Sequence, residues 1–316
     1  MVMTRILVVY YSQTGQLTRA ARAFLEPLNG HRDVVVDWHE VRPASPYPFP
    51  WPFLTFFDAF PESVYLQPPP LAATPLNVNT PYDLVILAYQ VWFLSPSLPI
   101  TAFLKSPHAQ VLNGRRVITL ITCRNMWTTA HLTMQGLLRA AGAQLVDNVV
   151  LTDRGPLWST FITTPWWLLT GQQGPWFGVL PRAGISAADI AGTARFGRAL
   201  VDALPAIERG ERGPFLCGLQ AVQVNRLTML AERIGHRSFL IWGRLIRAAG
   251  APGSLRRKPI LLLYVVFLVA IILTVLPISM TIAAILARVS SRVAQQAAQL
   301  EAPSGSTGER LVRFKQ

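Results

Sequence analysis

Five short apolar runs alternate with segments of helical spacing over the first two thirds of the chain. The runs are rich in β-branched and aromatic residues and cover 5–11, 33–38, 83–89, 117–122 and 145–151. Such continuous runs are typical of strands buried on both faces of a parallel sheet. Helical spacing covers 17–28, 98–105, 129–141 and 187–204, with Ser186 as a cap for the last segment. The alternation predicts an α/β fold with a doubly wound, five-stranded parallel sheet.

A polar loop with the sequence SQTGQLT, residues 12–18, separates the first predicted strand from the first helix. The backbone N–H groups of such a loop and the N-terminus of the helix point at one spot, where the helix dipole favours an anion. The loop has no Walker Gly-Lys-Ser/Thr and lacks the three glycines of a dinucleotide fingerprint. The candidate phosphate-binding residues are Ser12, Gln13, Thr14, Gly15, Gln16 and Leu17. An ordinary strand–turn–helix connection with a hydroxyl cap is the alternative.

The loops after the third and fourth predicted strands supply further candidates. Ligands of open α/β sheets bind outside the carboxyl ends of the strands, so these loops and the first one converge if the strands are neighbours. The candidates are Tyr89, Gln90, Val91, Trp92 and Phe93 in the first loop, and Cys123, Arg124, Asn125 and Trp127 in the second. Weaker candidates for a catalytic base, chosen by loop position only, are His131, Asp153 and Tyr89.

These segments together resemble the flavodoxin-like family. VVYYSQTGQLTRAA is similar to the FMN-phosphate loop of flavodoxins, although Leu17 stands where Thr is usual and the next Thr, Thr18, comes one place later. YQVWFLSPSLP is similar to the loop that related flavin reductases place against the isoalloxazine. With PYPFPWPF and CRNMW, these segments resemble most closely the flavodoxin-like proteins called dialkylresorcinol condensing enzymes. The resemblance implies strand order 2-1-3-4-5, an FMN cofactor held by the listed loops, and a part in making alkyl-substituted resorcinol rings.

Two inserts interrupt the pattern of the predicted domain, residues 1–204. The first, 43–70, is dense in proline and aromatic residues, and the prolines forbid a long helix or a central strand. Its rings either pad the core, or form an apolar wall over the cofactor edge or an apolar substrate entrance. The second insert, 154–181, contains Trp166 and Trp167, which either pack in the core or at a subunit contact, or face a membrane or a long-chain substrate.

Residues 259–287 form a run of 29 without a charge. About 20 such residues cross the hydrocarbon core of a bilayer, so the run predicts a transmembrane segment. A re-entrant hairpin that turns near Pro277 is the alternative. The polar tail, 288–316, is expected to be disordered after Glu301.

Charge is distributed unevenly around this segment. Residues 1–204 carry 14 basic and 11 acidic side chains, and 205–316 carry 15 and 5. The basic residues of the juxtamembrane region, 205–258, crowd the segment's N-terminal flank at Arg244, Arg247, Arg256, Arg257 and Lys258. The positive-inside rule then predicts a single pass through the inner (cytoplasmic) membrane, with the large N-terminal domain in the cytoplasm. Residues 239–247 are suited either to an interfacial helix or to docking onto the domain.

These patterns favour membrane lipid over nucleic acid as a partner, and the two cysteines and five histidines show no metal-ligand spacing. The main hypothesis is a membrane-anchored FMN oxidoreductase that acts on a hydrophobic small molecule, as in the biosynthesis of dialkylresorcinols or related aromatic lipids. The alternatives are a membrane-tethered electron carrier and a flavin-free scaffold for partner enzymes or a carrier protein of a biosynthetic complex.

Overall fold

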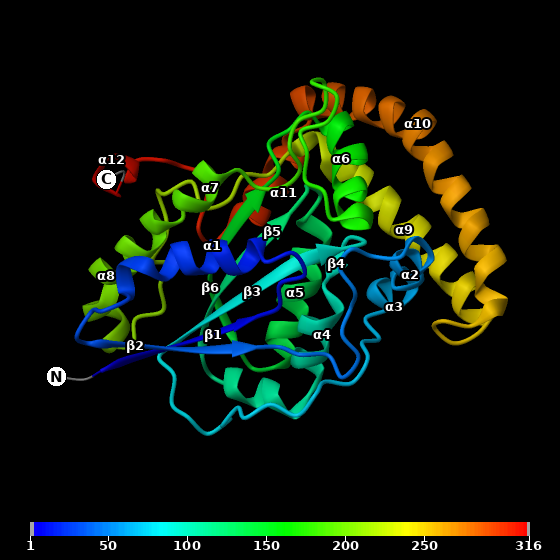
Figure 1. Ribbon diagram of the computed structural model, residues 1–316. Coiled ribbons are helices and arrows are strands. Elements are labelled where there is room, and N and C mark those ends of the chain that lie inside the picture. Colours follow the sequence, from blue (N-terminus) through cyan, green and yellow to red (C-terminus); the bar gives the residue numbers. More distant parts are fainter. Residues whose placement is uncertain (1–2, 315–316) are drawn as a thin grey trace.

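The computed structural model describes residues 3–314, with the side chains at 230, 276, 280 and 283–289 left aside. A parallel sheet in the order β2-β1-β3-β5-β6 forms its centre (Figure 1). A two-residue strand, β4, pairs antiparallel with the end of β3. Without β4 this is the flavodoxin-like order 2-1-3-4-5, so the predicted fold class is confirmed. The strands are β1 (Thr4–Tyr10), β2 (Val34–Glu40), β3 (Leu84–Trp92), β4 (Ser95–Pro96), β5 (Arg116–Cys123) and β6 (Gln144–Thr152).

Helices cover both faces of the sheet, as the doubly wound fold requires. The helices α1 (Gln16–Leu25) and α8 (Ala194–Glu208) pack together on one face, and α4 (Leu98–Lys105) and α5 (Thr128–Ala140) lie on the other (Figure 1). The middle of β1, from Ile6 to Val9, has at most 1% of its side-chain surface exposed. This burial explains why the apolar runs show no alternation.

Two predicted helices differ from the structure in detail. The first ends at Leu25 and continues as a 3-10 turn, Glu26–Leu28, that contains Pro27. The predicted helix 187–204 is broken into α7 (Ala187–Ala191), which Ser186 caps as expected, and α8. The break falls at Thr193, whose buried hydroxyl donates to the Ile190 and Ala20 carbonyls and so competes with the helical pattern.

The C-terminal tail is ordered, which corrects the predicted disorder after Glu301. It forms α11 (Ser291–Glu301) and α12 (Leu311–Phe314), and it covers the edge strand β6 together with residues 213–224. The Ser304 hydroxyl accepts from the Asn148 N–H at 2.7 Å, and the Val150 N–H donates to the Ala221 carbonyl at 2.9 Å. The tail therefore pairs backbone groups that an edge strand would otherwise leave open.

A second hydrophobic cluster joins the first insert to the C-terminal helices. It contains Phe60, Val64, Ile246, Leu261 and Tyr264. These residues come from α3 (Phe60–Val64), α9 (Arg226–Ala248) and α10 (Lys258–Val289), and the short helix α2 (Phe53–Asp58) lies beside them. The helix α10 arches along one side of the molecule and continues through Pro277 without the turn of a hairpin (Figure 1).

Three further helices complete the fold. The second insert contains α6 (Leu157–Thr170), which ends where Gly171 adopts a φ of +76°. The other two are the 3-10 helices Pro107–Leu112 and Leu255–Arg257. Among the described residues, one helical stretch, Leu255–Ser279, is long and apolar enough to cross a membrane by its length and composition.

Candidate functional site

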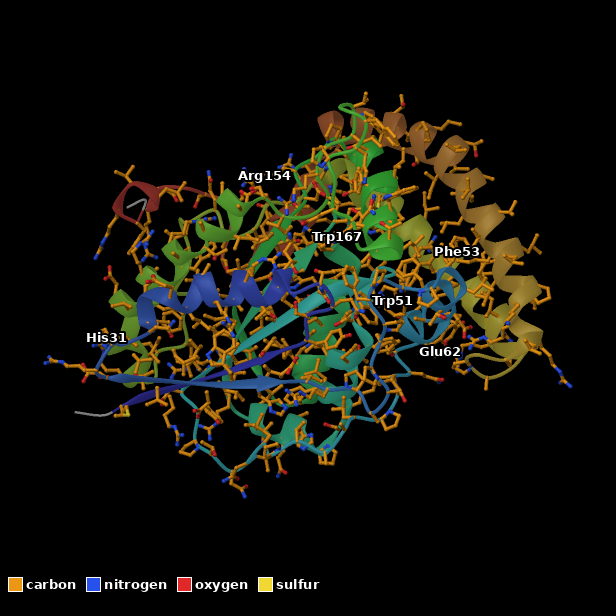
Figure 2. All side chains as sticks on the ribbon, viewed as in Figure 1. His31, Trp51, Phe53, Glu62, Arg154 and Trp167 are labelled. Carbon is orange, nitrogen blue, oxygen red and sulfur yellow. The ribbon has the colours of Figure 1, made fainter. Side chains whose placement is uncertain are left out.

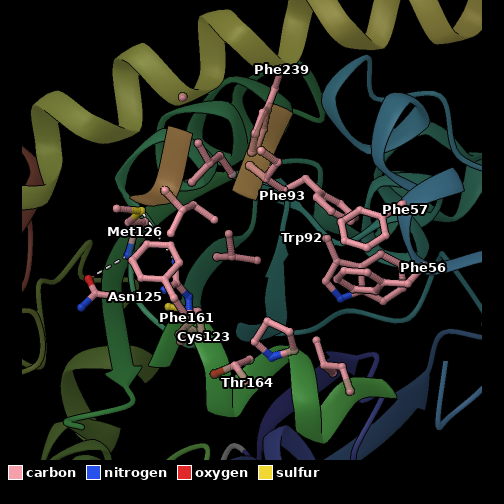
Figure 3. Close-up of a pocket in the computed structure, with 18 of the residues that line it drawn as sticks. Phe56, Phe57, Trp92, Phe93, Cys123, Asn125, Met126, Phe161, Thr164 and Phe239 are labelled. Atoms are coloured by element: carbon pink, nitrogen blue, oxygen red, sulfur yellow. Dashed lines mark hydrogen bonds between the residues drawn. The ribbon is translucent and has the colours of Figure 1, made fainter. Parts of the chain in front are cut away.

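A cavity of about 400 Å³ lies at the carboxyl ends of β1, β3 and β5. Its floor is the polar loop after β1 and the loops after β3 and β5, which the parallel sheet brings to one edge. Its walls come from the first insert and α6, and its roof comes from α9 and α10 (Figure 3). The predicted residues that line it are Gln13, Thr14, Gln16, Gln90, Val91, Trp92, Phe93, Cys123, Arg124 and Asn125.

The loop after β1 is built to receive an anion. Gly15 adopts a φ of +74° and begins α1. Within the described part of the chain, the backbone N–H groups of Thr14, Gly15, Gln16 and Leu17 donate no hydrogen bond. Four free donors at the positive end of a helix dipole fit a phosphate group.

Three side chains of this loop are engaged within the protein. The Ser12 hydroxyl accepts from the Thr18 N–H at 3.4 Å, so it shapes the loop from within. The side chain of Gln16 donates to the Ile185 carbonyl at 3.1 Å and accepts from the Ile185 N–H at 3.0 Å. Leu17 is fully buried in the core of the domain. The backbone of the loop and the side chain of Thr14, which lines the cavity, therefore remain available for a phosphate.

The loop after β3 folds back as a small hairpin, in which Trp92 pairs with Ser95. Phe93 and Leu94 form its tip with φ angles of 48° and 62°. Gln90 reaches the first loop, where its Oε1 accepts from the Gln13 N–H at 3.2 Å. The Trp92 ring meets Trp51 of the first insert edge-on, with 5.6 Å between ring centroids.

The two inserts meet beside this hairpin. The Trp51 N–H donates to the Leu168 carbonyl at 2.8 Å, and Phe49 packs edge-on against Trp167. Figure 2 labels Trp51 and Trp167 at this end of the sheet. Trp51, Phe56 and Phe57 line the cavity, whereas Phe60 is buried in the second cluster. The first insert thus forms an apolar wall and also pads the core.

Arg124 is the cationic side chain of the cavity floor. Its guanidinium lies 3.9 Å from the centroid of the Phe161 ring and donates to the Thr160 hydroxyl at 3.3 Å. Burial lowers the pKa of Arg124 to about 10, against the opposing influence of Cys123, Asp153 and Glu232. The group therefore stays protonated at neutral pH and can stabilise negative charge on a ligand in a poorly hydrated site.

The weaker catalytic candidates do not line the cavity. Tyr89 and His131 are fully buried, and burial lowers the pKa of His131 to about 4. His131 packs against Trp127, itself buried and absent from the cavity wall. The Asp153 carboxylate accepts from the Gly155 and Gly184 N–H groups and so holds two loop segments together. None of these four side chains lines the cavity.

Most of the apolar lining comes from three helical segments, and the sequence offered a substrate contact for one of them, the second insert. They lie on α6, α9 and α10, which follow the sheet domain or interrupt it. The spacing within α9 carries an apolar stripe, but no pattern links that stripe to this edge of the sheet. The lining residues on these helices are Phe161, Thr164, Pro165, Trp167, Leu168, Leu169, Ala231, Ile234, Gly235, Ser238, Phe239, Tyr264, Phe267, Leu268, Ile271, Ile272, Val275 and Ser279.

The cavity is polar at one end and apolar at the other. Among the described lining residues there is no carboxylate and no histidine, and Arg124 is the charged one. The polar groups gather around the loops after β1, β3 and β5, and the α9 and α10 lining is mainly apolar. This arrangement suits an amphiphilic ligand with a polar ring system and an apolar extension.

No protein-family model and no curated protein matches this chain. Solved structures that it resembles include an FMN-bound flavoprotein from Lactobacillus acidophilus, 17% identical over 46% of this chain and 93% of that one, with a TM-score of 0.38. An archaeal flavodoxin is 10% identical over 65% and 99%, with a TM-score of 0.36. An NADH:FMN oxidoreductase is 17% identical over 47% and 75%, with a TM-score of 0.31. At these values, the flavodoxin-like fold class rests on the sheet order itself.

Proposed function

We propose that the chain is a membrane-associated FMN oxidoreductase that acts on a hydrophobic substrate. The observation that carries the proposal is the continuous cavity, which joins a phosphate-type loop to an apolar chamber under α10. In flavodoxin-like sheets FMN binds at this edge, and the free amides of Thr14–Leu17 suit its phosphate. When bound, FMN supplies a two-electron acceptor, and the protein positions the substrate against it.

The cavity floor points to the chemistry of the substrate's polar end. Arg124 offers a fixed positive charge, and none of the described lining side chains is a carboxylate or histidine that could serve as a strong base. A ring that is already acidic, such as the enol of a cyclic 1,3-diketone, needs no such base and gains from a cation beside its oxygen. The resemblance to dialkylresorcinol condensing enzymes extends the proposal to alkylated rings of this type and to biosynthetic partner proteins.

The enclosed walls favour an enzyme over an electron carrier. A carrier exposes the edge of its cofactor to a partner protein, whereas the first insert, α6 and α10 enclose this cavity on several sides (Figure 3). The space beneath α9 and α10 would be without use to a carrier, but it matches the apolar part of a substrate.

The test is the visible spectrum of the detergent-purified chain, with mass analysis of the released cofactor. We expect a yellow protein that releases FMN at about one per chain. Anaerobic addition of a cyclic 1,3-diketone with an alkyl chain should then bleach the flavin band. A colourless protein that stays colourless with added FMN would contradict the flavin proposal and favour the scaffold.

A matched pair of variants tests the cation. Arg124→Gln should slow the bleaching by about 10- to 1,000-fold, because it removes the charge beside the substrate's polar end. Arg139→Gln, on the exposed last turn of α5, should leave the rate unchanged. Equal rates in both variants would show that Arg124 takes no part in the reaction.

A further inference from the structure

The apolar helix α10 is fastened at its N-terminal end to the body that carries the sheet. The guanidinium of Arg257, which is fully buried, pairs with Asp58 at 3.3 Å and Glu62 at 3.1 Å. Nearly two turns into the helix, the Tyr264 ring stacks on Phe60 with 4.5 Å between centroids and 5° between planes. Both contacts are with the first insert, which is part of the wall of the cavity.

The segment that follows α10 is fastened to the same body. The first contact is made by α11, whose Ala297 and Leu300 pack with Met229 of α9. The second contact reaches the buried sheet, where the Ser304 hydroxyl donates to the Asp147 carboxylate of β6 at 2.7 Å. Beyond it, the Gln220 N–H donates to the Thr307 carbonyl at 2.8 Å. The chain before α10 and the chain after it are thus both joined to one α/β domain.

This attachment is incompatible with a single crossing of a bilayer. A helix of 32 residues is about 48 Å long, and a crossing would leave its two flanks on opposite sides of a hydrocarbon core about 30 Å thick. Ser304 would then lie across the membrane from Asp147, and their hydrogen bond could not form. The docked tail and the single pass predicted from the sequence exclude each other.

The two faces of α10 differ in what covers them. Tyr264, Phe267, Ile271 and Val275 face the cavity and form its roof. The opposite face is open, with Val266 and Leu273 exposing 67% and 70% of their surface. The exposed apolar residues on this side, which we call the outer face of α10, are Leu262, Leu263, Val266, Val269 and Leu273.

The neighbouring helix α9 adds positive charge beside exposed apolar groups. Ile241 and Leu245 are exposed on it, and Arg237 and Arg244 are exposed between and beside them. Arginines interleaved with apolar residues are typical of helices that lie in the headgroup region of anionic membranes. The charge and the apolar surface together therefore favour an anionic bilayer as the occupant of the outer face.

We propose that α10 lies in the plane of an anionic leaflet and does not cross it, so that both of its flanks stay on the side of the α/β domain. The proposal refines the membrane association proposed above and does not depend on the flavin. It places the roof of the cavity in the leaflet, where an apolar substrate is concentrated. A substrate can then pass from the lipid around α10 into the cavity without entering water.

Single-cysteine labelling in sealed inverted membrane vesicles tests the side of each flank. Three exposed positions each receive one cysteine: Ala251→Cys before α10, Gln299→Cys after it and Ala188→Cys on the domain. The two native cysteines are removed in every variant by Cys123→Ser and Cys217→Ser. A membrane-impermeant maleimide should label all three without detergent. Labelling of Gln299→Cys only after permeabilisation would overturn the in-plane arrangement while leaving membrane association intact.

Spin labels at Leu262 and Leu273 test the depth of the outer face in phosphatidylglycerol-containing vesicles. These positions are 11 residues apart, so a crossing helix would separate their depths by about 16 Å. In-plane binding predicts similar depths within one leaflet and strong exposure to oxygen dissolved in the lipid. Dipolar coupling between spin labels on two copies, without exposure to oxygen, would show that a second copy of the chain covers the outer face and would overturn the proposal. Failure of the protein to bind the vesicles would refute the proposed association with a membrane. FMN absorbance is read separately and reports only on the flavin proposal.

Discussion

Gly15 offers a sharp test of the proposed phosphate site. Its φ of +74° lies in the left-handed region, and an added Cβ would meet Arg19 Nη1 at 3.5 Å, which is ordinary contact. The added Cβ therefore meets no steric clash. The cost of Gly15→Ala is instead the free energy needed to hold a residue with a Cβ in the left-handed conformation, about 1–2 kcal/mol. Without FMN, the loop of the variant relaxes to an unstrained conformation. FMN binding must then restore the left-handed conformation, so the binding free energy is weakened by this amount.

That free energy corresponds to about 5- to 30-fold weaker FMN binding, since about 1.4 kcal/mol is a factor of ten. The matched control is Gly30→Ala, with a φ of +79° and no atom within 4 Å of the added Cβ. Gly30 precedes His31, which Figure 2 labels far from Trp51 and the cavity. The control should lose similar stability and bind FMN normally.

The assay is a titration of FMN fluorescence with detergent-purified protein, combined with thermal unfolding of each variant. Equal affinity of Gly15→Ala and the wild type would refute the reasoning that this loop holds the phosphate in its present conformation. An equal loss of affinity in both variants would show that the effect is a general loss of stability.

Two further predictions concern the attachments of the C-terminal segments. Burial raises the pKa of Asp147 to about 6 from an ordinary 3.8, so its contribution to stability falls as pH rises through that interval and is constant above it. Asp147→Asn should therefore gain up to about 3 kcal/mol relative to the wild type between pH 4 and 6, measured by denaturant unfolding across that range. If the free energies of unfolding of the wild type and Asp147→Asn differed by the same amount at every pH, the raised pKa of Asp147 would be contradicted. Arg257→Met should lose about 3–5 kcal/mol of stability, because it leaves Asp58 and Glu62 unpaired. The exposed neighbour provides the control, Arg256→Met, which should stay within about 0.5 kcal/mol of the wild type in the same unfolding experiment.

The sheet and the polar loops were predictable because their signals are local. A strand buried on both faces must be apolar throughout, and this condition can be read directly from β1, β3 and β5. The loops at their carboxyl ends then meet by the topology alone, which brought Gln13, Gln90 and Arg124 to one cavity.

Other features depended on contacts between residues distant in sequence. Tyr89 ends the third predicted strand and Trp127 lies in the loop after the fourth, but packing turned both into the core, and their sequence positions do not reveal which way the side chains point. The break at Thr193 depends on the carbonyl of Ala20, which is 173 residues away. These outcomes are decided by the partners that folding brings close.

The apolar segment shows this division most clearly. Its length and hydropathy are properties of the sequence, and they determined that residues 259–287 form one long apolar helix. Its relation to the domain depends on a hydrogen bond between Ser304 and Asp147, 157 residues apart, and on the Arg257 ion pairs. The sequence alone determined which side chains avoid water. The tertiary structure decided which of them face the cavity. The attachments at Arg257 and Ser304 hold both ends of α10 against the α/β domain, and this placement turns one side of the helix toward the cavity.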